Sequence, residues 1–228
     1  MKKFLAISGL SLSLVALPYC QAFSNDVGPS AILSPAENAY GSKYKELAAR
    51  WWQWAYSMPD EDGAVWDTTG AKCAMEQKGD IWFLAGGYGS ATIKRHCTVP
   101  EGRNIFFPII NMVYTDEGTN NVLMCSYLKS EVTIKEKDIS NIAVEINGHK
   151  VDDPKQYHVT SNCFELYGYP SSTGKLSRLA YAVTDGFWIL LSPLPKGKHN
   201  LKFGATYINP SDKSEKFTQD IEYILTVE

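Results

Sequence analysis

Five of the six tryptophans and one tyrosine lie within residues 51–82, and their rings have the chemistry to bind a ligand. They are Trp51, Trp52, Trp54, Tyr56, Trp66 and Trp82. A flat aromatic ring can stack on the apolar face of a sugar ring while its N–H or O–H group forms a hydrogen bond. Core packing is the other interpretation, because three of the tryptophans belong to one predicted helix. Trp52 lies off the apolar stripe of that helix and is expected to be exposed, so the candidate binding rings are Trp52, Tyr56 and Trp66.

Arg95 is a candidate for binding an anion, since a guanidinium group pairs well with carboxylates and phosphates. It stands beside His96 and Cys97, and a structural ion pair is the alternative role. The nearby sequence Gly86-Gly87-Tyr88-Gly89-Ser90 is rich in glycine. Such a loop either borders a site or simply turns the chain.

The sequence contains no local motif typical of a catalytic site. There is no GxSxG sequence around a serine, and the four histidines form neither an HxH nor an HExxH pair. The sequence Asp67-Thr68-Thr69-Gly70 has one threonine more than the Asp-Thr-Gly of aspartic proteases and no second copy, so a turn explains it better. A hydrolase acting on an extracellular polymer would instead need two carboxylates from distant segments. The candidates for such a pair are Asp67, Asp116, Glu117 and Asp185.

No metal or cofactor is expected. The acidic run Asp60-Glu61-Asp62 precedes a glycine, but the later ligands of an EF-hand loop are missing. The cysteines lack the CxxC spacing typical of zinc sites. No glycine-rich phosphate loop follows a predicted strand.

Residues 1–22 have the three parts of a secretory signal. Lys2 and Lys3 precede an apolar run over residues 4–17, and Cys20-Gln21-Ala22 offers small side chains for cleavage after Ala22. The run of about 14 residues is shorter than the ~20 that span a bilayer. Acylation at Cys20 is disfavoured because bulky Tyr19 precedes it.

Cleavage after Ala22 would leave 206 residues. The leader contains two lysines and no acidic residue, so the formal net charge changes from −3 to −5. A nucleic-acid partner would need a concentrated basic face and is not expected. We expect no transmembrane segment and a secreted or periplasmic location.

The four cysteines that remain after cleavage indicate two disulfides, because an even number in an exported chain is typical of a disulfide framework. They are Cys73, Cys97, Cys125 and Cys163. Three pairings are possible. The pairs Cys73–Cys97 and Cys125–Cys163 are favoured because they close the shortest loops.

One helix is clear from the sequence, over about Ser42 to Ser57, and Pro59 stops it. Its apolar residues recur at helical spacing, at Tyr44, Leu47, Ala48, Trp51, Trp54 (or Ala55) and Met58. This stripe should face a core.

From residue 80 onward, short apolar runs separated by turn residues indicate strands. They cover residues 81–85, 104–111, 122–128, 142–146, 164–167, 179–184, 187–191, 201–207 and 221–227. Pro108 indicates an edge or a bulge, Asn147-Gly148 a hairpin turn, and Asp185-Gly186 a break between two runs. The pattern predicts a mainly β fold, an antiparallel β-sandwich or jelly-roll-like domain with one N-terminal amphipathic helix packed on it. We expect one domain over 23–228, with a split near residue 100 as the alternative.

A set of sequence blocks along most of the exported part resembles a group of uncharacterised secreted bacterial proteins. The blocks are WWQW at 51–54, WFLAG at 82–86, RHCTVP at 95–100, IFFPIIN at 105–111 and PLPKGKH at 193–199. The resemblance implies export from a bacterial cell. It brings no activity and no catalytic residue.

The sequence favours a non-enzymatic, disulfide-stabilised binding protein that recognises a glycan or an extracellular protein partner through exposed aromatic rings. A secreted hydrolase with a carboxylate pair is the second hypothesis. A purely structural protein–protein module is the third.

The export and disulfide hypotheses predict the mass of the exported protein. Under non-reducing conditions, mass spectrometry should show a chain that starts at Phe23 and has no free thiol. Four free thiols would contradict the predicted disulfide framework.

Overall fold

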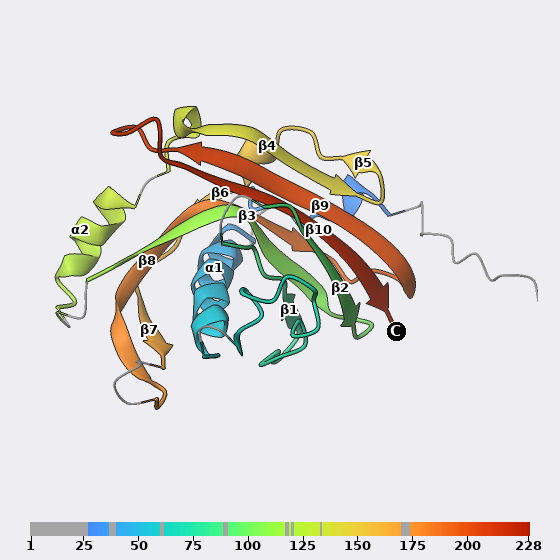
Figure 1. Ribbon diagram of the computed structural model, residues 1–228, viewed down its shortest axis with the longest axis horizontal. Coiled ribbons are helices and arrows are strands. Elements are labelled where there is room, and N and C mark those ends of the chain that lie inside the picture. Colours follow the sequence, from blue (N-terminus) through green and yellow to red (C-terminus); the bar gives the residue numbers. More distant parts are fainter. Residues whose placement is uncertain are drawn as a thin grey trace, which may run out of the picture.

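Two five-stranded sheets and one long helix are stacked in three layers (Figure 1). The computed structural model describes residues 27–36, 40–59, 62–88, 91–116, 119, 121–132, 134–169 and 174–228. The predicted secretory signal and its cleavage site lie outside these residues. The sheet in the middle layer is called the inner sheet and the other the outer sheet.

The inner sheet has the strand order β1-β3-β8-β6, with β7 also paired to β8. Its strands are β1 (Ile81–Phe83), β3 (Asn104–Thr115), β6 (His158–Thr160), β7 (Phe164–Gly168) and β8 (Ser177–Leu191). The outer sheet has the order β2-β10-β9-β4-β5. Its strands are β2 (Ile93–Val99), β4 (Ile139–Ile146), β5 (His149–Lys150), β9 (Gly197–Ile208) and β10 (Lys216–Val227).

Two α-helices and three short 3-10 helices complete the described structure. They are α1 (Tyr40–Tyr56), α2 (Met124–Glu131), η1 (Pro29–Ala31), η3 (Glu136–Asp138) and η4 (Pro154–Tyr157). Helix α1 packs on the inner sheet, against β3, β6, β7 and β8, on the side that faces away from the outer sheet (Figure 1).

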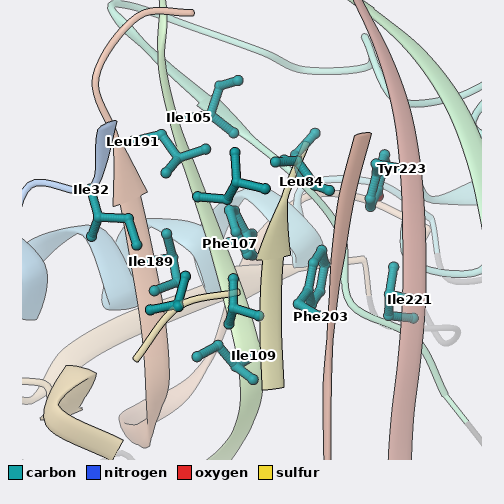
Figure 2. Close-up of a cluster of buried hydrophobic side chains, with 14 of the residues drawn as sticks. Ile32, Leu84, Ile105, Phe107, Ile109, Ile189, Leu191, Phe203, Ile221 and Tyr223 are labelled. Carbon is teal, nitrogen blue, oxygen red and sulfur yellow. The ribbon is translucent and has the colours of Figure 1, made fainter. Parts of the chain in front are cut away.

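The main core lies between the two sheets. Figure 2 shows side chains of β3 and β8 pointing toward those of β9 and β10. The labelled members are Ile32, Leu84, Ile105, Phe107, Ile109, Ile189, Leu191, Phe203, Ile221 and Tyr223. The alternating burial along β2, β9 and β10 follows from this arrangement, because every second side chain of a strand faces the same side.

A second core lies between the inner sheet and α1. The predicted stripe of α1 is confirmed, since Tyr44, Leu47, Ala48, Trp51, Trp54 and Met58 are all buried there. The Tyr44 hydroxyl donates to the Leu33 carbonyl at 2.7 Å and accepts from the Leu190 amide at 2.9 Å. One phenol thus joins α1, the N-terminal segment and the inner sheet.

The predicted mainly β sandwich with its N-terminal helix is confirmed, but the sheets are mixed rather than wholly antiparallel. Strand β1 pairs with β3 in parallel, and β2 pairs with β10 in parallel. Neither pair is joined by a hairpin, so no short turn forces an antiparallel arrangement. The Asn147-Gly148 hairpin between β4 and β5 is confirmed, with both residues at positive φ. Pro108 lies at a bulge in β3, as predicted, although β3 is a central strand.

Two predictions for individual strands are wrong. The apolar run at 122–128 belongs largely to α2, because Leu128 and Val132 lie four residues apart and pack together on Val183. Short apolar runs fit a buried helix as well as a strand. The break expected at Asp185-Gly186 lies inside the single strand β8.

Gly186 is a glycine because β3 comes very close to it. A Cβ atom there would lie 2.5 Å from the Ile110 carbonyl oxygen and 2.7 Å from the Asn111 Cα. These are backbone atoms of a central strand, which cannot rotate away as a side chain can.

Both disulfides have the pairing that the sequence favours. Cys73–Cys97 ties the segment after α1 to β2, and Cys125–Cys163 ties α2 to the segment between β6 and β7. Their Cα atoms lie 5.9 and 5.7 Å apart, within the usual range for disulfides.

Gly186→Ala should lower the free energy of unfolding by about 2–3 kcal/mol, because the added methyl group overpacks the centre of the sheet. Gly168→Ala is the matched control. Its Cβ would chiefly meet the end of the Leu179 side chain, which can move, so we expect a loss below about 1 kcal/mol. Urea unfolding measures both; equal losses would contradict this account of Gly186.

Candidate ligand-binding site

The tryptophans of α1 use their indole N–H groups to hold the fold together. Trp51 Nε1 donates to the Leu84 carbonyl at 2.8 Å, and Trp54 Nε1 donates to the Met75 carbonyl at 3.0 Å. These rings are core residues, in agreement with the second interpretation of the aromatic cluster.

The prediction that Trp52 is exposed is wrong. Its side chain is 7% exposed, and its Nε1 donates to the Thr184 hydroxyl at 2.7 Å. The buried face of α1 is wider than a single stripe because β6, β7 and β8 lie against the helix as well as β3. Trp52 therefore offers a ligand little more than one edge of its ring.

Trp66 and Tyr88 form an exposed aromatic pair on two separate loops. Their rings stack with centroids 4.5 Å apart, and the two residues are 51% and 47% exposed. Trp66 belongs to residues 63–70, called here the tryptophan loop, and Tyr88 to residues 84–88, called the tyrosine loop. We call the two rings the aromatic platform.

The Arg95 side chain forms hydrogen bonds with the backbone of both loops. The side chain is 1% exposed and points from β2 toward the loops. Its guanidinium donates to the carbonyls of Val65 and Asp67 in the tryptophan loop, at 3.1 and 2.6 Å. It also donates to the carbonyls of Ala85 and Gly86 in the tyrosine loop, at 3.0 and 2.7 Å. The predicted anion-binding arginine is therefore committed to the backbone and supports the platform instead of reaching solvent.

Tyr223 completes this support. Its hydroxyl donates to the Ala85 carbonyl at 3.0 Å and accepts from the Ala85 amide at 3.1 Å, while Arg95 Nη1 lies 3.3 Å away. Burial raises the pKa of the Tyr223 phenol, so the hydroxyl keeps the proton that it donates.

Asp67 shapes the tryptophan loop through a turn, as the sequence predicts. One carboxylate oxygen accepts from the amide and the hydroxyl of Thr69, and the other accepts from the Lys72 amide. Burial acts to raise the pKa of Asp67, but these hydrogen bonds outweigh it, so the pKa lies below its ordinary value. Asp67 is thus an ionised structural residue.

A small pocket of about 40 Å³ opens beside the platform. It forms where the chain after β1 leaves β3 and crosses toward the outer sheet, where the Gly87 amide donates to Gln219 Oε1 at 3.0 Å. The lining residues carry no charge. They are Trp51, Trp52, Val65, Gly86, Gly87, Tyr88, Asn111, Phe217 and Gln219.

The structure brings three of the four predicted binding residues to this place, in different roles. Trp66 lies in the platform, Trp52 lines the pocket, and Arg95 holds the loops. Tyr56 packs against Trp52, with ring centroids 5.9 Å apart, and does not line the pocket.

Sequence reasoning missed Tyr88, Asn111 and Gln219 as site residues. The glycine-rich segment around Tyr88 was a signal for the first, since such a loop can border a site. Asn111 and Gln219 lie on strands far apart in the sequence, and nothing near them indicates that they share a pocket.

A larger groove of about 510 Å³ lies on the outer sheet. All its lining residues belong to β4, β5, β9, β10 and the segment that follows β5. Several of its polar groups are paired within the groove, as in Lys202–Glu145 at 3.8 Å and Thr206–Thr218 at 3.1 Å. Phe203, the one aromatic residue in its lining, points into the core (Figure 2). The groove thus lacks an exposed ring, and the pocket beside the platform is the better candidate.

The carboxylates suggested for a hydrolase each hold their own part of the backbone. Asp116 accepts from the amides of Tyr181 and Asn121. Asp185 is fully buried and accepts from the Ile134 amide at 2.6 Å and the Thr160 hydroxyl at 2.5 Å. Glu117 lies outside the described residues.

The third partner of Asp185 is His158, whose Nε2 lies 2.9 Å from the carboxylate. This hydrogen bond raises the pKa of His158. The Asp185 carboxylate thus joins β8 to β6 and to the segment at Ile134, so its role is structural.

No family model, curated protein or solved structure matches the chain in the comparisons with known proteins. Within the described residues, no three His, Cys, Asp or Glu side chains are arranged to hold a metal ion. None of the helices in the described ranges has the length and apolar character needed to cross a membrane.

Arg95→Lys should lower the free energy of unfolding by about 3 kcal/mol or more, because several buried carbonyls lose their donors. It should also speed hydrogen exchange at the Lys72 and Gly87 amides, one in or beside each loop. Arg50→Lys is the control, since Arg50 makes a partly exposed ion pair with Glu46 and its replacement should cost less than about 0.5 kcal/mol. Unchanged exchange at both amides in Arg95→Lys would contradict the supporting role.

Proposed function

We propose that this chain is an exported binding protein whose ligand stacks on the aromatic platform. The observation that carries the proposal is the exposed Trp66–Tyr88 pair on loops that a buried arginine fixes in place. Large exposed rings are costly to leave in water and are enriched at recognition sites. A platform that is already rigid loses little conformational entropy on binding.

The ligand is a neutral glycan. The residues that line the pocket beside the platform are uncharged, and the guanidinium below it is bonded to carbonyls. A charged group would be desolvated there without a partner, which is unfavourable. A sugar ring offers an apolar face for stacking and hydroxyl groups for amides such as those of Asn111 and Gln219.

Export is part of the proposal. The two disulfides support it, because such bonds persist in oxidising compartments. The leader-like sequence at 1–22 and the resemblance to secreted bacterial proteins agree with it.

A glycan array followed by titration of the best ligand tests the proposal. Trp66→Ala and Tyr88→Ala should each weaken binding about tenfold or more, which corresponds to about 1.4 kcal/mol. Because both side chains are exposed, the melting temperature should change little.

Tyr127→Ala is the matched control. Tyr127 is an equally exposed aromatic residue, at 54%, and lies on α2, away from the two loops (Figure 1). Its replacement should leave binding unchanged. If the platform variants bind as tightly as the wild type, or if all three variants weaken binding equally, the platform is not the site.

A further inference from the structure

One residue that lines the pocket beside the platform has a side-chain nitrogen that no described residue satisfies. Asn111 Nδ2 is buried and has no hydrogen-bond partner among the described residues. The neighbouring amide in the pocket differs, since Gln219 Oε1 accepts from the Gly87 amide. A buried donor without an acceptor costs about 1–3 kcal/mol, and a ligand that supplied the acceptor would recover that cost.

Three other buried side-chain nitrogens have no hydrogen-bond partner in the part of the chain that the structure describes. They belong to Trp82, Arg178 and Trp188, and none of these residues lines the pocket. Asn111 is therefore distinguished by its place, since it is the one of the four that lines the pocket beside Tyr88.

The strand partner of Asn111 leaves room for its side chain. Asn111 pairs with Gly186 in the sheet, and a side chain at that position would come within 2.7 Å of the Asn111 Cβ. The missing side chain leaves the space that the asparagine occupies.

The pocket has the size of a small substituent rather than of a whole sugar ring. Its volume of about 40 Å³ corresponds to about three water-sized positions, at ~10–15 Å³ each. An acetyl group has three heavy atoms: a carbonyl carbon, its oxygen and a methyl carbon. The Trp51 and Trp52 rings and Phe217 supply apolar wall for the methyl group.

We propose that this pocket receives the acetyl group of a 2-acetamido sugar whose ring lies on the aromatic platform. The proposal rests on the proposed glycan-binding function. When the Asn111 side chain turns toward the ligand, Nδ2 donates to the acetyl carbonyl and Oδ1 accepts from the sugar's amide N–H, so that two amides pair in both directions. A sugar with a hydroxyl group at C2 has no methyl group to fill the pocket and cannot form both hydrogen bonds. It therefore binds more weakly than the 2-acetamido sugar.

Three trisaccharides with the same β-1,4 backbone test the proposal by isothermal titration calorimetry. They are triacetylchitotriose, its deacetylated form and cellotriose, which carry acetamido, amino and hydroxyl groups at C2. The wild type should bind the acetylated sugar about tenfold or more tighter than the other two. Asn111→Leu, which fills the pocket, should weaken binding of the acetylated sugar about tenfold and so abolish this preference.

Asn162→Ala is the matched control, because Asn162 is exposed and does not line the pocket; it should keep the preference. If Asn111→Leu does not fold, the comparison of the three sugars on the wild type still decides. Equal binding of all three, with Trp66→Ala weakening each, overturns the acetyl pocket and leaves the glycan platform standing. If none of the three binds, the acetyl pocket is wrong, and the glycan array with Trp66→Ala decides the platform separately.

Discussion

The Arg95 guanidinium is the interaction on which the proposed site depends. It bonds to carbonyls of two loops that are separate in the sequence. The next two residues of β2 add further ties: the His96 amide donates to the Thr69 carbonyl, and Cys97 forms a disulfide with Cys73. Strand β2 is an edge of the outer sheet, and an uncovered edge invites pairing with other chains. Arg95, His96 and Cys97 therefore hold the tryptophan loop and Cys73 against this edge. The same bonds fix the aromatic platform.

Much of the architecture could be predicted because its signals are local. Alternating apolar residues indicate β4, β9 and β10 of the outer sheet, and the helical stripe beginning at Tyr44 indicates α1. Proximity in sequence favours both disulfide pairs. The failures have one cause, which is tertiary context. The run at 122–128 has no period that separates strand from helix. Gly186 looks like a turn residue, but the close approach of β3 explains it.

The site was harder to predict than the fold because its parts are distant in sequence. Trp66 and Arg95 could be selected by residue type, yet their roles depend on what surrounds them. Trp52 has the position of an exposed residue on α1 until β6 to β8 cover that side of the helix. Asn111 carries no local signal at all. It matters because its strand neighbour is a glycine and because the tyrosine loop departs from β3 beside it.

We therefore propose that ligand binding takes place at the aromatic platform and its neutral pocket, and not in the larger groove of the outer sheet. The groove offers volume, but several of its polar groups are already paired, and its one aromatic residue points into the core. The pocket offers an exposed ring and, in Asn111, a side-chain nitrogen that no described residue satisfies. A crystal structure of the protein with triacetylchitotriose tests the claim most directly. We predict a sugar ring on Trp66 or Tyr88 with its acetyl group against Asn111. Density for the sugar in the outer groove, with the platform empty, would contradict the account.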